Sequence, residues 1–242
     1  MIKVVEMIKR RPDLDVEPFQ HHWLHTHGPI VARIPGLRRY VQSHTRLGGY
    51  RRNTGAGEPS SVPYDGIAEL WFDDKEALAA ITSTEEFAAA KRDEPNFIDL
   101  APLVELVVDE HIIKDGPTPE GGIKNIEFVH LSPALDPEEA HRYWREVHGP
   151  IAARIPTMSR YVQSHTRMGA YGRPTRPPLD GIAVTWWADL DAMRASAAGP
   201  EYAATRADEA NFLGDEPEVI LTTEHVIVGW TDLDPTVDDR GS

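Results

Sequence analysis

The sequence predicts an α+β protein made of two tandem ferredoxin-like (βαββαβ) units. Residues 27–50 align with residues 148–171 at a constant offset of 121, with 18 identities in 24 positions. Each copy also shows the order strand, helix, two strands, helix, strand. The helices of such a unit cover only one face of its antiparallel sheet, and a second copy can cover the other. We therefore expect the two sheets to face each other as a pseudo-dimeric α+β barrel.

The repeat also predicts the domain boundaries. The first domain is expected at residues 1–115 and the second at 123–230, each long enough to bury its own core. Residues 116–122, rich in Gly and Pro, read as the linker between them. The acidic segment 231–242 is predicted to be a disordered tail.

Each copy opens with a strand and a capped helix. The first strand is predicted over residues 2–8, and Asp15 is the expected N-cap of the helix that follows. Asp136 takes this place in the second copy, where Pro137 at the first helical position makes the cap stronger. Residues spaced by four share one buried stripe of this helix. They are Phe19, Trp23 and His27 in the first copy, and Ala140, Trp144 and His148 in the second.

The second strand, predicted over residues 37–47, carries polar residues on both faces. A Gly/Pro/Ser-rich loop follows, with 14 residues over 51–64 in the first copy and 8 over 172–179 in the second. Unequal loops suggest unequal pocket entrances, and so a single working site. Third strands open at Asp65-Gly66 and Asp180-Gly181, where the aspartates read first as turn residues. Alanine-rich helices and last strands over 103–113 and 219–228 complete the copies.

Composition excludes several classes of function. The net charge of -14 and the pI near 5.2 argue against a nucleic-acid binder, which needs a basic surface. The absence of cysteine excludes disulfides, thiolate metal sites and thiol nucleophiles. No apolar run is long enough to span a bilayer, and the chain starts with a strand rather than a signal peptide. We expect a cytoplasmic protein that binds neither membranes nor nucleic acids.

The conserved stripe and the strand after it resemble the EthD family of dimeric α+β barrel proteins. The resemblance rests on Phe19, Trp23 and His27-Gly28-Pro29, followed by Ile34-Pro35 and Tyr40-Val41-Gln42, and the second copy matches from Tyr143-Trp144 to Gln163. It covers the chain as two tandem EthD domains. It implies a family linked to ether degradation, with fungal members similar to dehydratases and decarboxylases of aromatic polyketides. Barrel relatives include polyketide cyclases, heme-binding oxygenases and isomerases.

Four alternating polar residues on the second strand are the first candidate site. Buried polar side chains must be hydrogen-bonded or face a wet cavity, so we expect this row to line the barrel interior, on the sheet face without helices. An interdomain hydrogen-bond network along a symmetric seam is the alternative. The row consists of Tyr40, Gln42, His44 and Arg46, repeated as Tyr161, Gln163, His165 and Arg167.

The histidines at the end of the first helix are the second candidate site. His27 and His148 could act as general acid or base, or could simply cap the helix. A metal site at His21, His22 and His25 is disfavoured, because the second copy retains none of these histidines and we expect no metal. Trp71 and Trp186 could stack an aromatic ligand or belong to the core.

These residues suggest a cofactor-independent lyase that acts on an aromatic or polyketide-like carbonyl compound. Catalysis is assigned to His44 and His165 or His27 and His148 as the base, with Tyr40 and Tyr161 as oxyanion donors. Substrate binding is assigned to Gln42, Gln163, Arg46, Arg167, Trp71 and Trp186. The alternatives are a non-catalytic protein that binds a small hydrophobic molecule, and a heme-dependent protein with an axial histidine. A homodimer of the tandem chain is a further expectation.

Overall fold

The computed structural model describes residues 1–49 and 62–230, and the predicted tail over 231–242 lies outside them, as does most of the loop over 51–64. The chain forms two compact units. The first unit comprises residues 1–44, 50–105 and 224–242, and the second comprises 45–49 and 106–223. Among the described residues, no helix is both long enough and apolar enough to cross a membrane.

The two repeats contain the same succession of elements. The first repeat consists of β1 (Ile2–Ile8), α1 (Val16–His22), the π-helical turn η1 (Trp23–His27), α2 (Gly28–Val31), β2 (Leu37–Thr45), η2 (Leu47–Gly49), β3 (Gly66–Phe72), α3 (Lys75–Ile81), α4 (Glu85–Asp93), η3 (Glu94–Asn96) and β4 (Val104–Lys114). The second consists of β5 (Ile123–Val129), α5 (Pro137–Tyr143), the π-helical turn η4 (Trp144–His148), α6 (Gly149–Ala152), β6 (Met158–Thr166), η5 (Met168–Ala170), β7 (Gly181–Trp187), α7 (Leu190–Ser196), α8 (Pro200–Glu209) and β8 (Glu218–Val228). The predicted α+β class and the tandem βαββαβ units are confirmed.

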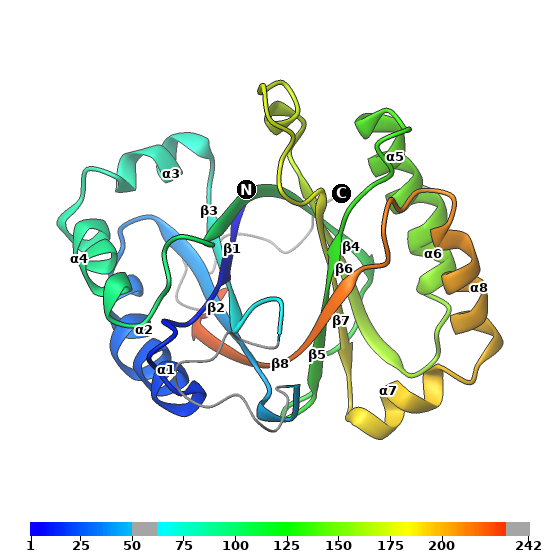
Figure 1. Cartoon of the computed structure of the whole chain (residues 1–242), viewed down its shortest axis with the longest axis horizontal. Coiled ribbons are helices and arrows are strands. Elements are labelled where there is room, and N and C mark those ends of the chain that lie inside the picture. Colours follow the sequence, from blue (N-terminus) through cyan, green and yellow to red (C-terminus); the bar gives the residue numbers. More distant parts are fainter. Residues whose placement is uncertain (50–61, 231–242) are drawn as a thin grey trace. The chain divides into compact units, whose positions relative to one another are not determined.

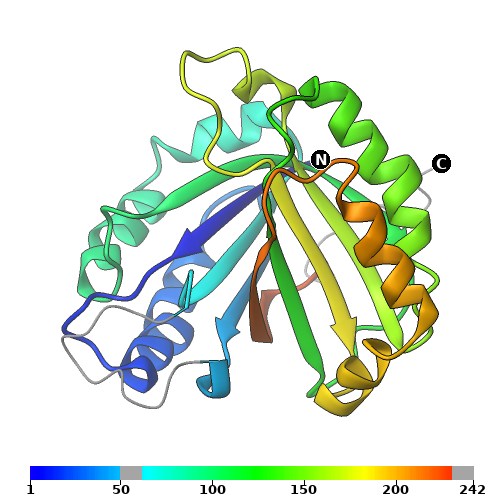
Figure 2. The same ribbon diagram turned by 45° about the vertical axis from the view of Figure 1, so that its right-hand side comes forward.

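Each unit places its helices on one side of an antiparallel sheet. In the first unit β3 lies between β1 and β2, and α1 to α4 lie on one side of these strands (Figure 1). In the second unit the strand order is β8-β5-β7-β6-β4. There α8 (orange) lies beside α5 and α6 (green) over one face of the sheet (Figure 2). Each sheet therefore has one helix-covered face and one opposite face.

The last strand of each repeat also takes part in the other unit. Residues 106–114 of β4 belong to the second unit, where Val108 pairs with Thr166 and Asp109 with His165 of β6. Residues 224–228 of β8 belong to the first unit. The sequence repeats and the compact units therefore do not coincide.

The first helices differ in their caps as the sequence predicts. The carboxylate of Asp136 accepts hydrogen bonds from the backbone N–H groups of Glu138 and Glu139, at 3.0 and 3.2 Å. Asp15 occupies the N-cap position of α1, but its side chain makes no capping hydrogen bond. Asp15 is therefore the N-cap residue, as predicted, but without a side-chain capping bond, and the stronger cap of the second copy is confirmed.

The first helix continues into a π turn that packs against the sheet. The Gly28 N–H binds the carbonyl of Trp23, an i→i+5 bond, and Trp23 and His27 are buried on the sheet side. The ring of Trp23 lies directly over the start of β3. A Cβ atom at Gly66 would lie 2.3 Å from Cζ3 of Trp23 and 2.9 Å from the carbonyl oxygen of Ser43. Only glycine at position 66 allows this close approach.

We predict that Gly66→Ala lowers the free energy of unfolding by about 1–3 kcal/mol, because the added methyl group overpacks the contact with Trp23. Chemical denaturation followed by circular dichroism measures the effect. Gly48→Ala is the matched control, since a Cβ atom at Gly48 would have no neighbour within 4 Å. Equal stabilities of the two variants would show that the contact with Trp23 does not constrain β3.

Candidate active site

A cavity of about 310 Å³ lies between the sheet and the helices of the first unit. The strands contribute residues from their helix-covered face, among them Glu6 of β1 and Tyr40 of β2. His27 closes it at the end of the π turn, and Lys91 and Glu94 reach it from α4 and η3. Most of the remaining wall is apolar. This cavity combines an apolar body with a few polar groups, as small-molecule sites do.

The Gln42 side chain connects the π turn to the sheet. Its Nε2 donates to the carbonyl oxygen of Trp23 at 2.9 Å and to the hydroxyl of Tyr40 at 2.9 Å. Its Oε1 accepts a hydrogen bond from Nε2 of His44 at 3.0 Å. A Cβ atom at Gly28 would lie 3.2 Å from this amide, which explains why glycine follows the histidine. The amide is fully buried and uses both its donor and its acceptor ends.

The Tyr40 hydroxyl is arranged as a hydrogen-bond donor toward the cavity. It accepts hydrogen bonds from Trp23 Nε1 at 3.3 Å and from Gln42 Nε2 at 2.9 Å. Two donors therefore occupy its lone pairs, and its own proton remains for a third group. Burial raises the pKa of Tyr40, so the hydroxyl keeps that proton at neutral pH. Such a hydroxyl can stabilise negative charge that develops on a carbonyl oxygen.

His27 is oriented by a carboxylate from α4. Its Nδ1 lies 3.0 Å from Oδ2 of Asp93, which can only accept, so Nδ1 carries the proton and Nε2 has the lone pair. Burial lowers the pKa of His27, and the carboxylate of Asp93 opposes this shift. The carboxylate also binds His22 Nε2 at 3.0 Å and Asn96 Nδ2 at 3.0 Å. The imidazole is therefore neutral near pH 7 and can accept a proton at Nε2.

Glu6 is the carboxyl group whose proton affinity suits acid catalysis. Burial raises its pKa to about 7, an effect opposed by the ammonium group of Lys91 and increased by the carboxylates of Glu105 and Glu94. Lys91 itself binds Oε1 of Glu94 at 2.7 Å. A carboxyl group with a pKa near 7 exists in both protonation states at neutral pH, as a general acid or base requires.

The polar row on β2 packs against the helices, which corrects the expectation that it lines the opposite sheet face. The imidazole of His44 stacks on Trp23 with ring centroids 4.3 Å apart and an interplanar angle of 2°. Burial lowers the pKa of His44 to about 3, with smaller effects from His225 and His25. Trp23 of the π turn makes these contacts: its carbonyl oxygen accepts a hydrogen bond from Gln42, and its ring stacks on His44. Of the row, Tyr40 lines the cavity.

The remaining predicted site residues do not line this cavity. The backbone N–H of Arg46 binds the carbonyl oxygen of Leu221 at 2.8 Å, beyond the end of β2. Arg167 pairs with Asp109 at 3.1 Å. Trp71 and Trp186 lie on the sheet face opposite the helices, as strand alternation from Leu70 and Thr185 requires. Asp65 and Asp180 accept long-range hydrogen bonds from the backbone N–H groups of Arg10 and Leu131, at 3.0 and 2.7 Å, rather than local turn bonds.

The second unit repeats the scaffold with a different lining. His148 Nδ1 lies 3.0 Å from Asp208, and Gln163 Nε2 binds the Trp144 carbonyl at 3.0 Å and Tyr161 at 2.8 Å. His165 stacks on Trp144 at 4.2 Å. In place of Val4, Leu70 and Phe72 the second unit has Asn125, Thr185 and Trp187.

These three residues of the second unit form a hydrogen-bonded group. Thr185 Oγ1 accepts from Trp187 Nε1 at 3.0 Å and from Asn125 Nδ2 at 3.3 Å, and Asn125 also binds Glu127 at 3.0 Å. Glu127, the counterpart of Glu6, is therefore engaged by an amide. The positions that are apolar at Val4 and Leu70 in the first unit are polar in the second, and Phe72 is replaced by the larger Trp187.

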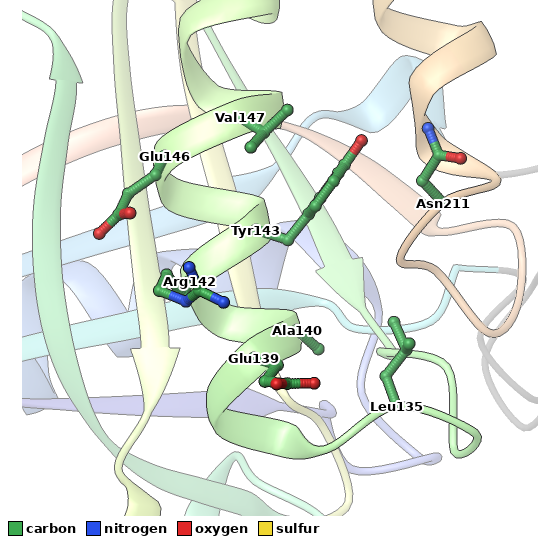
Figure 3. Close-up of a pocket in the computed structure, with 8 residues that line it drawn as sticks. All are labelled: Leu135, Glu139, Ala140, Arg142, Tyr143, Glu146, Val147 and Asn211. Atoms are coloured by element: carbon green, nitrogen blue, oxygen red, sulfur yellow. The ribbon is translucent and has the colours of Figure 1, made fainter.

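A second hollow lies on the outer surface of the second unit. It has a volume of about 250 Å³ beside α5, where Ala140, Tyr143 and Val147 form one wall and Asn211 the other (Figure 3). Glu139, Arg142 and Glu146 border it. None of the catalytic or substrate-binding residues predicted from the sequence lines this hollow. It is therefore not the candidate active site.

Two kinds of functional residue were missed from the sequence. Asp93 and Asp208 belong to a repeated pattern Asp-Glu-x-Asn-Phe at an offset of 115. Glu6 and Glu127 are acidic residues at equivalent places in otherwise apolar strands, at an offset of 121. Comparison of the two copies within the sequence could have revealed all four residues. Among the described residues, no cluster of three His, Cys, Asp or Glu side chains could hold a metal ion. The rings of His21 and His25 lie 4.7 Å apart, measured between their centroids.

We predict that Asp93→Asn lowers the pKa of His27, because the carboxylate that opposes the effect of burial is removed. Titration of the imidazole C–H signals by proton NMR measures the shift, with His27→Gln used for assignment. His148, which keeps Asp208, is the internal reference and should titrate as in the parent protein. An unchanged pKa of His27 would show that Asp93 does not control its proton affinity.

Two known structures share the fold over most of the chain. The whole chain resembles the structure of an anthrone oxidase-like protein, with a TM-score of 0.61 and 11% identity over 95% of this chain and 94% of that chain. It also resembles a proposed monooxygenase of Fusobacterium nucleatum, with a TM-score of 0.60 and 11% identity over 93% of both chains. At such identities the likeness shows the fold alone.

Sequence comparison identifies the family. No curated protein is significantly similar to the chain. The profile of the EthD domain matches residues 11–101 and again residues 132–216, which together make up more than half of the chain. The two matches coincide with the two repeats. The chain belongs to the EthD family and carries two EthD domains in tandem.

Proposed function

We propose that the first unit is a cofactor-independent enzyme of the lyase type, which removes a proton next to the carbonyl group of an aromatic or polyketide-like compound. The observation that carries the proposal is the presence of three matched groups in one cavity: the His27–Asp93 pair, the Tyr40 hydroxyl and the Glu6 carboxyl. A base, an oxyanion donor and an acid are what such an elimination needs.

The reaction is a dehydration of a β-hydroxy carbonyl compound. Nε2 of His27 takes the proton on the carbon next to the carbonyl, and Tyr40 donates a hydrogen bond to the enolate oxygen. The carbon–oxygen bond of the β-hydroxyl then breaks, and Glu6 gives its proton to the leaving oxygen, so that water departs. The products are an α,β-unsaturated carbonyl compound, a protonated His27 and an ionised Glu6. Exchange with solvent returns both residues to their starting states.

The proposal assigns the working site to the first unit. Its cavity wall is apolar at Val4, Leu70 and Phe72, which suits an aromatic ring. In the second unit the counterparts bind one another and Glu127. A carboxyl group that already accepts an amide hydrogen bond is less available as an acid. The second unit would then supply structure rather than chemistry.

Heme, which some barrel relatives bind, fits this cavity poorly. His27 could offer Nε2 as an axial ligand, since Asp93 holds its other nitrogen. The lining, however, includes Glu6, Glu94 and Glu105, which would oppose the carboxylates of a heme. We derive no step through heme, and an absorption spectrum after heme addition tests this directly. A Soret band that depends on His27 would overturn it.

Non-catalytic binding of a hydrophobic metabolite is the competing function, favoured by the mainly apolar wall of the same cavity. The two functions differ in what happens to the ligand. A carrier releases its ligand unchanged, whereas the proposed lyase releases a product lighter by one water molecule. Mass spectrometry of ligands incubated with the native protein distinguishes them.

We predict that Glu6→Gln lowers turnover of an aromatic β-hydroxy ketone by about 10²–10⁴-fold, because the leaving hydroxyl loses its proton donor. Absorbance of the conjugated enone measures the rate. Glu127→Gln, the same change in the second repeat, should leave turnover unchanged. A loss of equal size in both variants would contradict the assignment to the first unit, and full activity of Glu6→Gln would contradict the mechanism.

We predict a bell-shaped dependence of kcat/KM on pH. The rate should fall as pH rises through about 7, where Glu6 loses the proton it must donate. It should also fall at acidic pH, where His27, whose pKa burial lowers, becomes protonated and can no longer act as a base. Glu6→Gln should remove the alkaline limb and keep the acidic limb. A parent profile that is flat between pH 6 and 9 would contradict the role of Glu6, and a profile without an acidic limb would contradict that of His27.

A further inference from the structure

The sheet face opposite the helices carries an unexpected group of charges in the first unit. Lys3 and Glu69 form an ion pair at 2.9 Å and are almost completely buried, with side-chain exposures of 3% and 2%. The Lys3 ammonium lies 4.6 Å from the ring centre of Trp71. The Arg39 guanidinium lies 5.4 Å from the same ring on the neighbouring strand. A buried ion pair and the Arg39 guanidinium therefore lie close to the Trp71 ring.

Two buried donors in this group have no hydrogen-bond partner. They are Nε1 of Trp71, a side chain that is only 7% exposed, and Nε of Arg39. Both groups can only donate, so the group they lack is an acceptor. A buried donor without a partner is costly, and native structures satisfy such groups with protein, water or ligand. Because the Arg39 guanidinium is a cation, a negatively charged acceptor would satisfy it best.

The second repeat shows which acceptors bind the equivalent arginine. Arg160 is the counterpart of Arg39, and its guanidinium binds the carboxylate of Asp115 and the carbonyl oxygen of Gly116 at 3.2 Å. The position equivalent to Asp115 in the first repeat is Gly229, which has no side chain. The chain thus supplies its own carboxylate to Arg160. It supplies none from the equivalent position to Arg39.

The surroundings of Arg39 favour a carboxylate attached to an apolar or aromatic body. The guanidinium lies 5.4 Å from the ring of Trp230 as well as from that of Trp71, and the two rings are 6.0 Å apart. Trp230 is 41% exposed, so this side of the group is open to solvent. A ligand that reaches Arg39 would contact aromatic surface on the way.

We infer that Arg39 and Trp71 form a second ligand site, which binds a small carboxylate with an aromatic body on the sheet face opposite the cavity. One carboxylate oxygen accepts from Nε of Arg39 and the other from Nε1 of Trp71. The site is separate from the proposed lyase cavity, because Arg39 and Trp71 alternate with Tyr40 and Leu70, which line that cavity.

Benzoate is the probe, and the indole N–H signal of Trp71 in the full-length ¹⁵N-labelled chain is the readout. The signal is assigned with Trp71→Phe, and titrations are made at constant ionic strength. We expect a saturable shift of this signal with benzoate and none with benzamide, which has the same ring but no charge. Arg39→Met should weaken benzoate binding about tenfold or more, as expected for loss of a charged hydrogen-bond partner.

The second repeat provides the matched control. Arg160→Met should bind benzoate as the parent chain does, since Asp115 already occupies that arginine. Unmoved indole signals from Trp23 and Trp144, which pack on the helix-covered faces, show that each variant remains folded. The inference is overturned if the Trp71 signal does not shift saturably, if benzamide binds equally well, or if Arg160→Met weakens binding as much as Arg39→Met. Tighter binding of inorganic phosphate than of benzoate would overturn the assignment to a carboxylate. None of these outcomes depends on turnover.

Discussion

The hydrogen bond from the Gln42 amide to the carbonyl of Trp23 is the interaction on which the candidate site depends. The π turn presents that carbonyl to the sheet, and a glycine after the histidine lets the amide approach. The same amide then fixes Tyr40 and His44 through its remaining hydrogen bonds. Because the amide is fully buried, loss of any one partner would leave a costly unsatisfied group. The second repeat builds the same connection with Gln163 and Trp144.

The two repeats share this scaffold and differ in what surrounds it. The His–Asp pair, the stacked histidine and the tyrosine–glutamine contact occur in both. Side chains that line the cavity in the first unit have changed in the second, as in the replacement of Phe72 by the larger Trp187. A duplicated chain can keep one copy of a site for chemistry while the other copy keeps the packing. Preservation of a residue in both repeats therefore does not by itself indicate a role in catalysis.

Strand alternation gives each sheet two chemically distinct faces. Tyr40 lies on the face covered by helices, and its neighbour Arg39 lies on the other. The helix-covered face combines a neutral imidazole, a carboxyl group with a pKa near 7 and an apolar wall. The opposite face of the first unit holds a buried ion pair and donors without acceptors. One small sheet can thus serve proton transfer on one side and anion recognition on the other.

The sequence by itself determined the duplication, the order of elements, the EthD family and the buried stripe of Phe19, Trp23 and His27. These follow from local spacing and from comparison between the copies, which need no knowledge of long-range contacts. Only the tertiary structure decided which face of β2 the helices cover, because a period of two identifies two faces but does not say which neighbour packs on each. It also decided the partners of the site. His27, Asp93 and Glu6 come from three elements far apart in the chain, and only packing brings them to one cavity.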